Sequence, residues 1–277
     1  MAFTEHKSIK SPFIFKRTFQ VYQTRGLKYL IYSVLLFLFY RYTAFLSRER
    51  SNPQTRVSDR LVVKEVNGIK MHLALTDTGL SRDLIQEGLR EVNILETMKK
   101  ELKEGQIVVD IGANIGYYAL LEAKIVGREG RVYAIEPVQE SIELLKKSIE
   151  LNEFSNVELY QLAIGNKTGV ASFYVRNKLN LSSMREADLD SRQENVITTR
   201  KIDVEVVTLD DFLINKPYPN IIRMDTEGFE WQIIKGMGKT LQKELPLTLF
   251  MEFHFNILKI DESLEILRTL KSAGFKI

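Results

Sequence analysis

The sequence predicts an α/β fold in which helices cover both faces of a doubly wound, mostly parallel sheet. From residue 107 onward, short runs of β-branched and other apolar residues alternate with segments of helical periodicity. The first two of these runs end in acidic residues, Asp110 and Glu136, with a glycine or a proline close behind. This order of elements favours parallel strands joined by right-handed crossovers.

The residues before that alternation predict a hairpin and a broken helix. Residues 61–75 alternate apolar and polar side chains on both sides of Asn67-Gly68, which is the dipeptide typical of a two-residue hairpin turn. Residues 81–102 have helical periodicity, and Gly88 interrupts it.

The remaining elements follow the same alternation in chain order. We expect parallel strands over residues 107–111, 132–136, 157–164, 221–225 and 247–253. We expect helices after the first glycine turn and over residues 138–151, 208–213 (with Thr208 as N-cap), 230–236 and 261–273. Residues 170–175 and 204–207 are predicted to add antiparallel strands at the sheet edge, and residues 275–277 to begin one more strand.

Residues 107–118, I-V-V-D-I-G-A-N-I-G-Y-Y, predict a buried strand, a tight glycine turn and a helix N-terminus, the layout that holds a nucleotide-like cofactor. The spacing is D-x-G-x-N-x-G, whereas G-x-G-x-x-G is the pattern that brings glycine backbone against a pyrophosphate. A carboxylate beside a glycine turn suits the mixed-charge tail of S-adenosylmethionine (SAM), which has no phosphate. We therefore predict cofactor contacts at Asp110, Gly112, Asn114 and Gly116. The alternative is a purely structural turn.

A further cofactor contact is predicted at Glu136, where the second strand ends. An acid about 20 residues beyond the glycine turn is placed to accept hydrogen bonds from ribose hydroxyls. A lone glutamate at a strand end is usually only solvated, but the upstream motif favours a ligand contact here. Tyr117, at the start of the first helix, and Ala163, near the end of the third strand, complete the predicted cofactor site.

Two further strand ends carry candidate catalytic residues. Asp225 and Glu227 follow one strand, and Glu252 and His254 close the next. Because the carboxyl ends of parallel strands open on one side, we expect Asp225 and Glu227 to face the cofactor cleft. They can orient an acceptor hydroxyl, take its proton or help to hold a metal; alternatively, Glu227 caps the following helix. His254 is the second candidate for a base, and a structural hydrogen bond is its alternative role.

The amino-acid composition excludes several kinds of functional site and binding partner. The 277 residues include no cysteine, which excludes disulfides, thiolate nucleophiles and cysteine-based zinc sites and fits a reducing compartment. The three histidines, His6, His72 and His254, are far apart in the sequence, so we predict no metal site. Residues 61–277 carry 28 basic and 33 acidic side chains, a net charge of −5, so we expect no nucleic-acid partner.

Residues 1–60 are predicted to be a basic, apolar extension that ends in a linker over residues 51–60, separate from the domain of residues 61–277. They hold eleven Lys and Arg against three acids. Within residues 27–46 the uncharged stretch is 12 residues long, too short to cross a hydrocarbon core of about 30 Å. We favour a helix of residues 27–46 on an anionic membrane surface, bound through residues 7–46.

Two alternatives for residues 27–46 are a single-pass membrane anchor and a helix packed on the protein itself. An anchor with its basic residues inside would place the following domain outside the cytoplasm, away from the usual supply of SAM. The expected location is therefore cytoplasmic, at the inner membrane surface.

Residues 177–200 are polar and irregular, with Ser182-Ser183 among them. A loop of this length inside a compact domain is either a functional lid or a disordered segment.

Several of these motifs together resemble the FkbM-type SAM-dependent methyltransferases. They run in the family's order over residues 92–277: V-V-D-I-G-A-N-I-G-Y-Y, V-Y-A-I-E-P, L-A-I-G, the Ser182-Ser183 loop, V-T-L-D-D-F-L and I-R-M-D-T-E-G-F-E-W-Q-I-I-K-G. The first motif alone indicates only a class I methyltransferase, whereas the last two make the resemblance specific. The resemblance implies a Rossmann-like, seven-stranded sheet. It also implies cofactor positions at Asp110, Gly112, Asn114, Gly116 and Glu136, and a second motif at Asp225, Glu227 and Gly228.

The sequence departs from the family pattern in two places. It stops at residues 274–277, where the family continues into a last pair of strands, so an incomplete sheet edge is expected. Residues 1–60 have no counterpart in the shared core.

The resemblance implies O-methylation of a hydroxyl on a sugar, glycan, lipid-linked or natural-product acceptor. Because an alcohol oxygen is a poor nucleophile, a base is expected beside it, with Asp225 or Glu227 as first candidates and His254 as the second. One alternative is an NAD-dependent oxidoreductase on a Rossmann sheet, which the missing G-x-G-x-x-G disfavours. The other is a non-catalytic, membrane-tethered SAM-binding module, which the complete cofactor motifs disfavour.

Overall fold

The structure, a computed structural model, describes residues 61–185, 198–255 and 257–276. The predicted extension of residues 1–60, with its helix over residues 27–46, lies outside the described residues, as does the middle of the loop of residues 177–200. Within the described ranges, no helix combines the length and the hydropathy needed to span a membrane.

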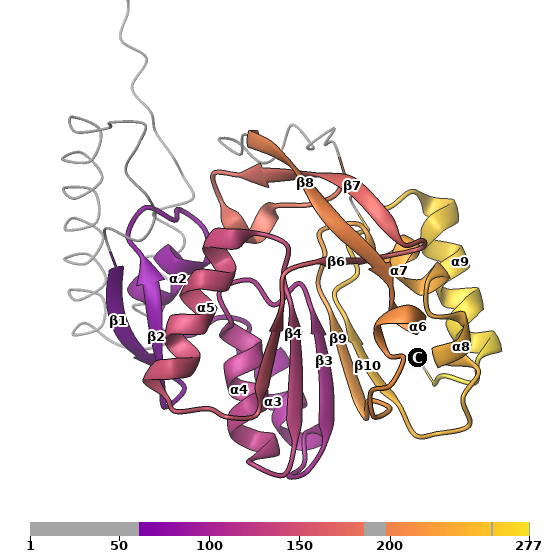
Figure 1. Cartoon of the computed structure of the whole chain (residues 1–277), viewed down its shortest axis with the longest axis horizontal. Helices are drawn as coiled ribbons and strands as arrows, with labels where there is room; N and C mark the ends of the chain where they lie inside the picture. The colour runs from indigo at the N-terminus through magenta and orange to yellow at the C-terminus, as the bar shows by residue number, and fades with distance from the viewer. Residues whose placement is uncertain (1–60, 186–197, 256, 277) are drawn as a thin grey trace, which may run out of the picture. The chain divides into compact units, whose positions relative to one another are not determined.

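A parallel sheet of five strands, in the order β10-β9-β3-β4-β5, forms the centre of the described domain (Figure 1). The strands are β3 (Ile107–Ile111), β4 (Arg131–Ile135), β5 (Val157–Tyr160), β9 (Ile221–Met224) and β10 (Thr248–Met251). The chain moves outward from β3 through β4 to β5 and later returns to β9 on the other side of β3. The strand order therefore reverses at β3, which is where sheets of this kind bind ligands.

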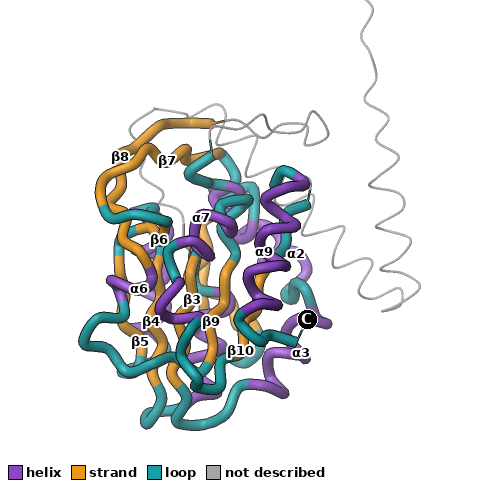
Figure 2. Tube along the Cα trace, turned by 90° about the vertical axis from the view of Figure 1, so that its right-hand side faces the viewer, coloured by secondary structure: helices purple, strands orange, loops and turns teal. Residues whose placement is uncertain are grey.

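Helices cover both faces of this sheet, which confirms the predicted doubly wound α/β fold (Figure 1). One face carries α2 (Leu80–Glu87), α3 (Val92–Glu101), α4 (Tyr117–Val126) and α5 (Gln139–Leu151). The opposite face carries α6 (Leu209–Phe212), α7 (Glu230–Lys235), α8 (Gly238–Leu241) and α9 (Ile260–Ser272), of which α7 and α9 lie in front of the strands in Figure 2.

The alternation of side chains along β3 assigns its residues to the two layers. Val108 belongs to the core beneath α4, whereas Val109 and Ile111 belong to the core beneath α7 and α9. Successive side chains of a strand point to opposite faces, so Asp110 points with Val108 toward α4. This direction decides what Asp110 can contact.

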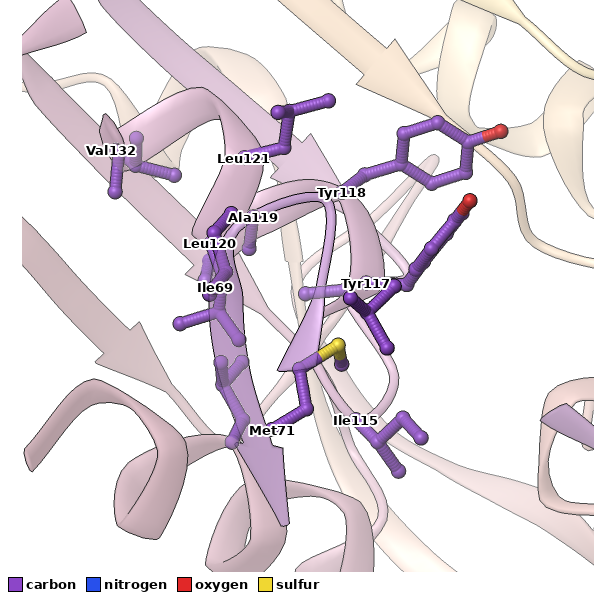
Figure 3. Packing of buried hydrophobic residues seen from close by; sticks show 14 of the residues in the cluster. Ile69, Met71, Ile115, Tyr117, Tyr118, Ala119, Leu120, Leu121 and Val132 are labelled. Atoms are coloured by element: carbon purple, nitrogen blue, oxygen red, sulfur yellow. The ribbon is translucent and has the colours of Figure 1, made fainter. Parts of the chain in front are cut away.

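The predicted hairpin and the break at Gly88 are both confirmed. β1 (Leu61–Val66) and β2 (Ile69–Ala74) pair antiparallel across Asn67 and Gly68, whose φ angles of 54° and 70° are those of a two-residue hairpin turn. Ile69 and Met71 of β2 pack beside Ile115 and the first turns of α4 (Figure 3). Gly88 ends α2 with a φ of 75°.

The single strand predicted over residues 157–164 is two strands in the structure. β5 ends at Tyr160, and β6 (Ala163–Gly165) leaves the central sheet to pair in parallel with β8 (Thr198–Thr208). Both segments are apolar, so periodicity did not reveal the bend between them.

β7 (Gly169–Arg176) pairs antiparallel with β8, as predicted, but β6, β8 and β7 form a sheet of their own and do not extend the central one. Thr208, at the end of β8, caps α6 as expected: its hydroxyl accepts from the N–H of Asp211 at 3.0 Å. In the described ranges, the central sheet thus has five strands where the resemblance implied seven. Residues 275–276 after α9 are not in a strand.

Candidate active site

The carboxyl ends of β3, β4 and β9 open into a cavity at the point where the strand order reverses. It encloses about 880 Å³, including the part open to solvent. Seven of the ten predicted site residues line it, namely Gly112, Asn114, Tyr117, Glu136, Ala163, Asp225 and Glu227. The other three, Asp110, Gly116 and His254, are not part of this lining.

The two glycines of the first motif allow the turn after β3 to pack tightly. Gly112 has a φ of 83°, and a Cβ on it would lie 2.0 Å from the carbonyl oxygen of Asp225. Its N–H donates to the carbonyl of Ile135 at 2.9 Å. Gly116 has a φ of 92°, and a Cβ there would lie 2.2 Å from Leu145 Cδ1. No side chain fits at Gly112, because the turns after β3 and β9 touch through their backbones.

Glu136 lies at the end of β4 with its carboxylate held by two backbone donors. Its Oε2 accepts from the N–H of Asn114 at 3.0 Å, and its Oε1 accepts from the N–H of Val138 at 2.8 Å. Burial raises the pKa of Glu136 to about 7 despite these two hydrogen bonds. Each oxygen keeps a lone pair, so the carboxylate can still accept from hydroxyl groups in the cavity.

Asp110 does not line the cavity but lies beneath it, completely buried and paired with Arg223 of β9. Arg223 Nη1 donates to Asp110 at 2.8 Å, and Nη2 donates to Asp225 at 3.0 Å. The guanidinium also lies 4.0 Å from the centre of the Tyr118 ring. Burial raises the pKa of Asp110, and the charge of Arg223 opposes that rise.

Sequence reasoning missed Arg223, although a signal was present. A single charged residue interrupts the buried strand I-I-R-M, and such a residue needs a buried partner. The register of β3 and β9 places Asp110 directly beside Arg223. Any influence of Asp110 on the cavity therefore passes through Arg223, which does line it.

The first turn of α4 holds the junction between α2 and α3 over the cavity. The Tyr117 hydroxyl donates to the carbonyl of Arg90 at 2.6 Å and accepts from the N–H of the same residue at 3.0 Å. The Tyr118 hydroxyl donates to the Glu91 carboxylate at 2.5 Å. The two rings stand edge to face at the start of α4 (Figure 3). Arg90 and Glu91, which the sequence did not single out, thereby become part of the cavity wall.

His254, beyond β10, brings several acids together. Its Nδ1 lies 2.9 Å from Glu230 Oε1, and its Nε2 lies 3.4 Å from Glu227, 3.6 Å from Glu252 and 3.9 Å from Asp225. Burial disfavours the imidazolium, but the hydrogen bond with Glu230 and the charge of Glu227 outweigh it and raise the pKa of His254 to about 9. Burial, reinforced by the charge of Asp225, raises the pKa of Glu227 to about 8.

Glu227 does not cap α7, whose N-cap Phe229 makes no side-chain capping hydrogen bond; Glu230 instead fixes the turn that precedes the helix. Glu230 Oε1 accepts from the N–H groups of Thr226 and Gly228, at 3.3 and 3.1 Å. Glu227 has a φ of 52°, unusual for a residue other than glycine, and its carbonyl accepts from the Ser183 hydroxyl at 2.9 Å. This backbone conformation leaves the Glu227 carboxylate beside His254.

The described first part of the loop of residues 177–200 lies against the cavity. A short 3₁₀ turn, η2 (Leu179–Leu181), begins it, and Leu179, Asn180, Ser182 and Met184 line the cavity wall. These residues form part of the cavity wall, and a lid over the site stays a prediction. Residues 186–197 lie outside the described ranges.

A comparison with known protein families identifies the family of this chain. A sequence profile described as the methyltransferase FkbM domain matches residues 110–277. The chain belongs to the FkbM methyltransferase family. The matched region begins at Asp110 and contains every predicted site residue.

Two curated relatives show how far the similarity extends. The chain is 25% identical over 150 residues to Methyltransferase 1 of Beauveria bassiana, a match covering 48% of this chain and 59% of the relative. It is 21% identical over 155 residues to the hexuronic acid methyltransferase AglP of Haloferax volcanii. This match covers 55% of this chain and 58% of the relative. The chain therefore spans less than two thirds of the length of these relatives.

Part of the chain is also similar to solved structures, among them the methyltransferase FkbM of Methylobacillus flagellatus KT. It is 22% identical, with a TM-score of 0.35 over 52% of this chain and 32% of that chain. The precorrin-6y C5,15-methyltransferase of Geobacter metallireducens GS-15 is 15% identical, with a TM-score of 0.41 over 68% of this chain and 72% of that chain.

Proposed function

We propose that this protein transfers a methyl group from SAM to a hydroxyl oxygen of a small-molecule or glycan acceptor. One observation carries the proposal: Glu136, Asp225 and Glu227 line a single cavity at the switch point of an FkbM-family sheet. The family match favours this reaction over the NAD-dependent oxidoreductase alternative. The relative named a hexuronic acid methyltransferase supports a sugar as the acceptor.

The lining of the cavity fits the parts of SAM. Glu136 can accept hydrogen bonds from the ribose hydroxyls, and the apolar side chains of Leu162 and Phe173 offer a surface for the adenine ring. Arg90 provides a cation for the methionyl carboxylate, and Asp225 an anion for the ammonium or sulfonium. We assign Asn114, Tyr117 and Ala163 to the same cofactor site. Asp110 acts on it by holding Arg223.

The carboxylates beyond β9 are proposed to handle the acceptor's proton. SAM supplies, when bound, a methyl group on a positively charged sulfur, so that a C–O bond forms as the C–S bond breaks and sulfur keeps the electron pair. Asp225 or Glu227 orients the acceptor hydroxyl and takes its proton, and His254 is the second candidate. The raised pKa of Glu227, about 8, is that of a group basic enough for this task near neutral pH.

The first test of this proposal is direct binding of SAM to the full chain by calorimetry. We expect the wild-type protein to bind SAM and Glu136→Gln to bind it at least about tenfold more weakly, since a neutral amide replaces the ribose-binding carboxylate. Glu158→Gln is the matched control, because Glu158 lies exposed on β5 and pairs only with Arg131 and Tyr160 among the described residues. Stabilisation by NADH with no binding of SAM would instead indicate the oxidoreductase.

The second test identifies the acceptor. SAM with a radiolabelled methyl group is incubated with the protein and with fractionated glycans, lipids and metabolites. Label in a glycan or sugar fraction, lost in Asp225→Asn, supports the proposal. SAM binding without label in any fraction would point to a non-catalytic binding module.

Residues 1–60 are proposed to form a separate extension that binds the inner surface of a membrane, in the cytoplasm, beside the methyltransferase domain of residues 61–277. The support is the charge and hydropathy of the sequence, since these residues lie outside the described ranges.

A further inference from the structure

Three side chains from the ends of two neighbouring strands form a group with the composition of a metal site. Asp225 and Glu227 follow β9, His254 follows β10, and these strands pair in parallel. One ligand atom from each residue lies within 4.8 Å of the others. The separation of the histidines in the sequence predicted no metal site, but the fold supplies carboxylates in place of further histidines.

His254 is held in the manner of a metal-binding histidine. Its side chain is only 9% exposed, and its Nδ1 bonds at 2.9 Å to Glu230, whose side chain is 0% exposed. Histidines that bind metals commonly donate the N–H of one ring nitrogen to a carboxylate, which orients the other nitrogen toward the ion. The other nitrogen here, Nε2, faces the oxygens of Glu227 and Asp225 at 3.4 and 3.9 Å.

Asp225 presents an oxygen that lacks a donor. Its Oδ2 accepts from Arg223, whereas Oδ1, on the side of His254, is buried and has no hydrogen-bond partner among the described residues. A buried carboxylate oxygen without a partner is costly, and a cation in this position would satisfy it.

The charges around His254 also favour a cation. Four carboxylates, those of Asp225, Glu227, Glu230 and Glu252, lie within 3.9 Å of its ring nitrogens. Arg223, the nearby guanidinium, is shared with the buried Asp110. The imidazolium of His254 and the guanidinium of Arg223 are the cations paired with these carboxylates, and a divalent ion that replaced the proton of His254 would supply the positive charge that they require.

We propose that Asp225, Glu227 and His254 bind one divalent transition-metal ion, with Glu230 as the residue that positions His254. Ligand atoms around such an ion, each about 2.0–2.2 Å from it, lie roughly 3–3.5 Å apart, so the 3.4 Å between His254 and Glu227 already fits. Asp225 Oδ1 lies 3.9 Å from His254 Nε2, and no two of the three ligand atoms are more than 4.8 Å apart, so Asp225 has to approach by at most about 1–2 Å. One imidazole and two carboxylates suit Mn²⁺, Fe²⁺ or Zn²⁺ better than Ca²⁺, which prefers oxygen ligands alone.

Three protein ligands leave coordination positions open on the ion. Because Asp225 and Glu227 also line the cavity, an open position there can take the oxygen of the methyl acceptor. Binding of the acceptor oxygen to the ion is the only part of this proposal that depends on the proposed function. The binding of the ion itself does not depend on SAM.

The experiment is a titration of the metal-free full chain with Mn²⁺, without SAM, followed by the electron paramagnetic resonance signal of free Mn²⁺. We expect one site per chain. Asp225→Asn and His254→Gln should each weaken binding by at least about tenfold, and Glu230→Gln by about 10–100-fold, as loss of a supporting partner does. Glu158→Gln, an exposed acid on β5, is the control and should bind Mn²⁺ like the wild type.

Several outcomes would overturn the proposal. Failure of the wild-type protein to bind Mn²⁺ or Zn²⁺, while it still binds SAM, excludes the ion and leaves the proposed function intact. Binding of Mn²⁺ that is unchanged in both Asp225→Asn and His254→Gln excludes these ligands. If one of these variants does not fold, Glu227→Gln gives the same readout. Binding of Mn²⁺ without binding of SAM would contradict the proposed function and not the metal site.

Discussion

The ion pair between Arg223 and Asp110 provides a quantitative test of how burial controls stability in this protein. The two side chains are 9% and 0% exposed and lie 2.8 Å apart. Arg131 and Glu158, on the neighbouring strands β4 and β5, also lie 2.8 Å apart but are 52% and 41% exposed. The distances are equal, so the two ion pairs themselves differ mainly in burial; Arg223 also pairs with Asp225 and contacts the Tyr118 ring.

Arg223→Met keeps an unbranched side chain about as long as the aliphatic part of the arginine and removes the guanidinium with its charge. The loss of one partner from a buried ion pair costs about 3–5 kcal/mol, because the other charge stays behind without compensation. Loss of the contact with the Tyr118 ring adds up to about 2 kcal/mol. We therefore expect Arg223→Met to lower the free energy of unfolding by at least about 3 kcal/mol, and Arg131→Met by less than about 1 kcal/mol.

The pH dependence gives the same prediction a second readout. Burial raises the pKa of Asp110 above its value in the unfolded chain, and removal of Arg223 raises it further. A carboxyl group with a raised pKa in the folded state stabilises the fold when protonated, and this contribution is lost as the pH rises through the folded pKa. The loss in the free energy of unfolding caused by Arg223→Met should therefore be smaller at about pH 5.5 than at about pH 7.5.

Urea denaturation of the full chain, followed by circular dichroism at both pH values, measures these differences. The double variant Asp110→Asn with Arg223→Met should recover part of the stability lost in Arg223→Met, because the fully buried charge of Asp110 is removed and only the partly exposed Asp225 still lacks its partner. Equal losses in Arg223→Met and Arg131→Met, or a double variant less stable than Arg223→Met alone, would show that burial does not set the energy of the Arg223–Asp110 pair.

Three further predictions concern the cofactor and the extension. Since the pKa of Glu136 is about 7, the affinity for SAM measured by calorimetry should rise from about pH 6 to about pH 8 as this carboxyl loses its proton, and Glu136→Gln should remove the rise. Gly112→Ala, which places a Cβ 2.0 Å from the Asp225 carbonyl, should lower both the melting temperature and the affinity for SAM. Gly105→Ala, with a similar φ of 79° and open space around it, should lower the melting temperature far less. Glutamine in place of the Lys and Arg of residues 7–28 should reduce co-sedimentation of the full chain with anionic vesicles but not its binding of SAM.

The sequence predicted the local elements well because their signals are local. The Asn67-Gly68 turn, the break at Gly88 and the Thr208 cap each depend on a few adjacent residues, and the structure contains all three. It also predicted which residues end the central strands, because apolar runs stop where the chain leaves the core. Glu136, Asp225 and Glu227, which follow the ends of β4 and β9, reach one cavity for that reason.

The sequence predictions that were wrong or incomplete have one physical cause: contacts between residues far apart in the sequence are not visible in local patterns. Periodicity does not report where an apolar run changes sheets, so β5 and β6 were predicted as one strand. The direction of Asp110 follows from strand alternation, but its partner Arg223 follows 113 residues later and becomes a neighbour only through the pairing of β3 with β9.

The class of fold, the family and the strand ends that carry polar residues all follow from the amino-acid sequence alone. They depend on composition and on the spacing of residues along the chain, and the sequence contains both in full. Only the tertiary structure decided which strand ends are neighbours, because strand order is a property of the folded sheet. That order placed β9 between β3 and β10, so Arg223 bridges Asp110 and Asp225, and the ring of His254 faces Glu227 and Asp225.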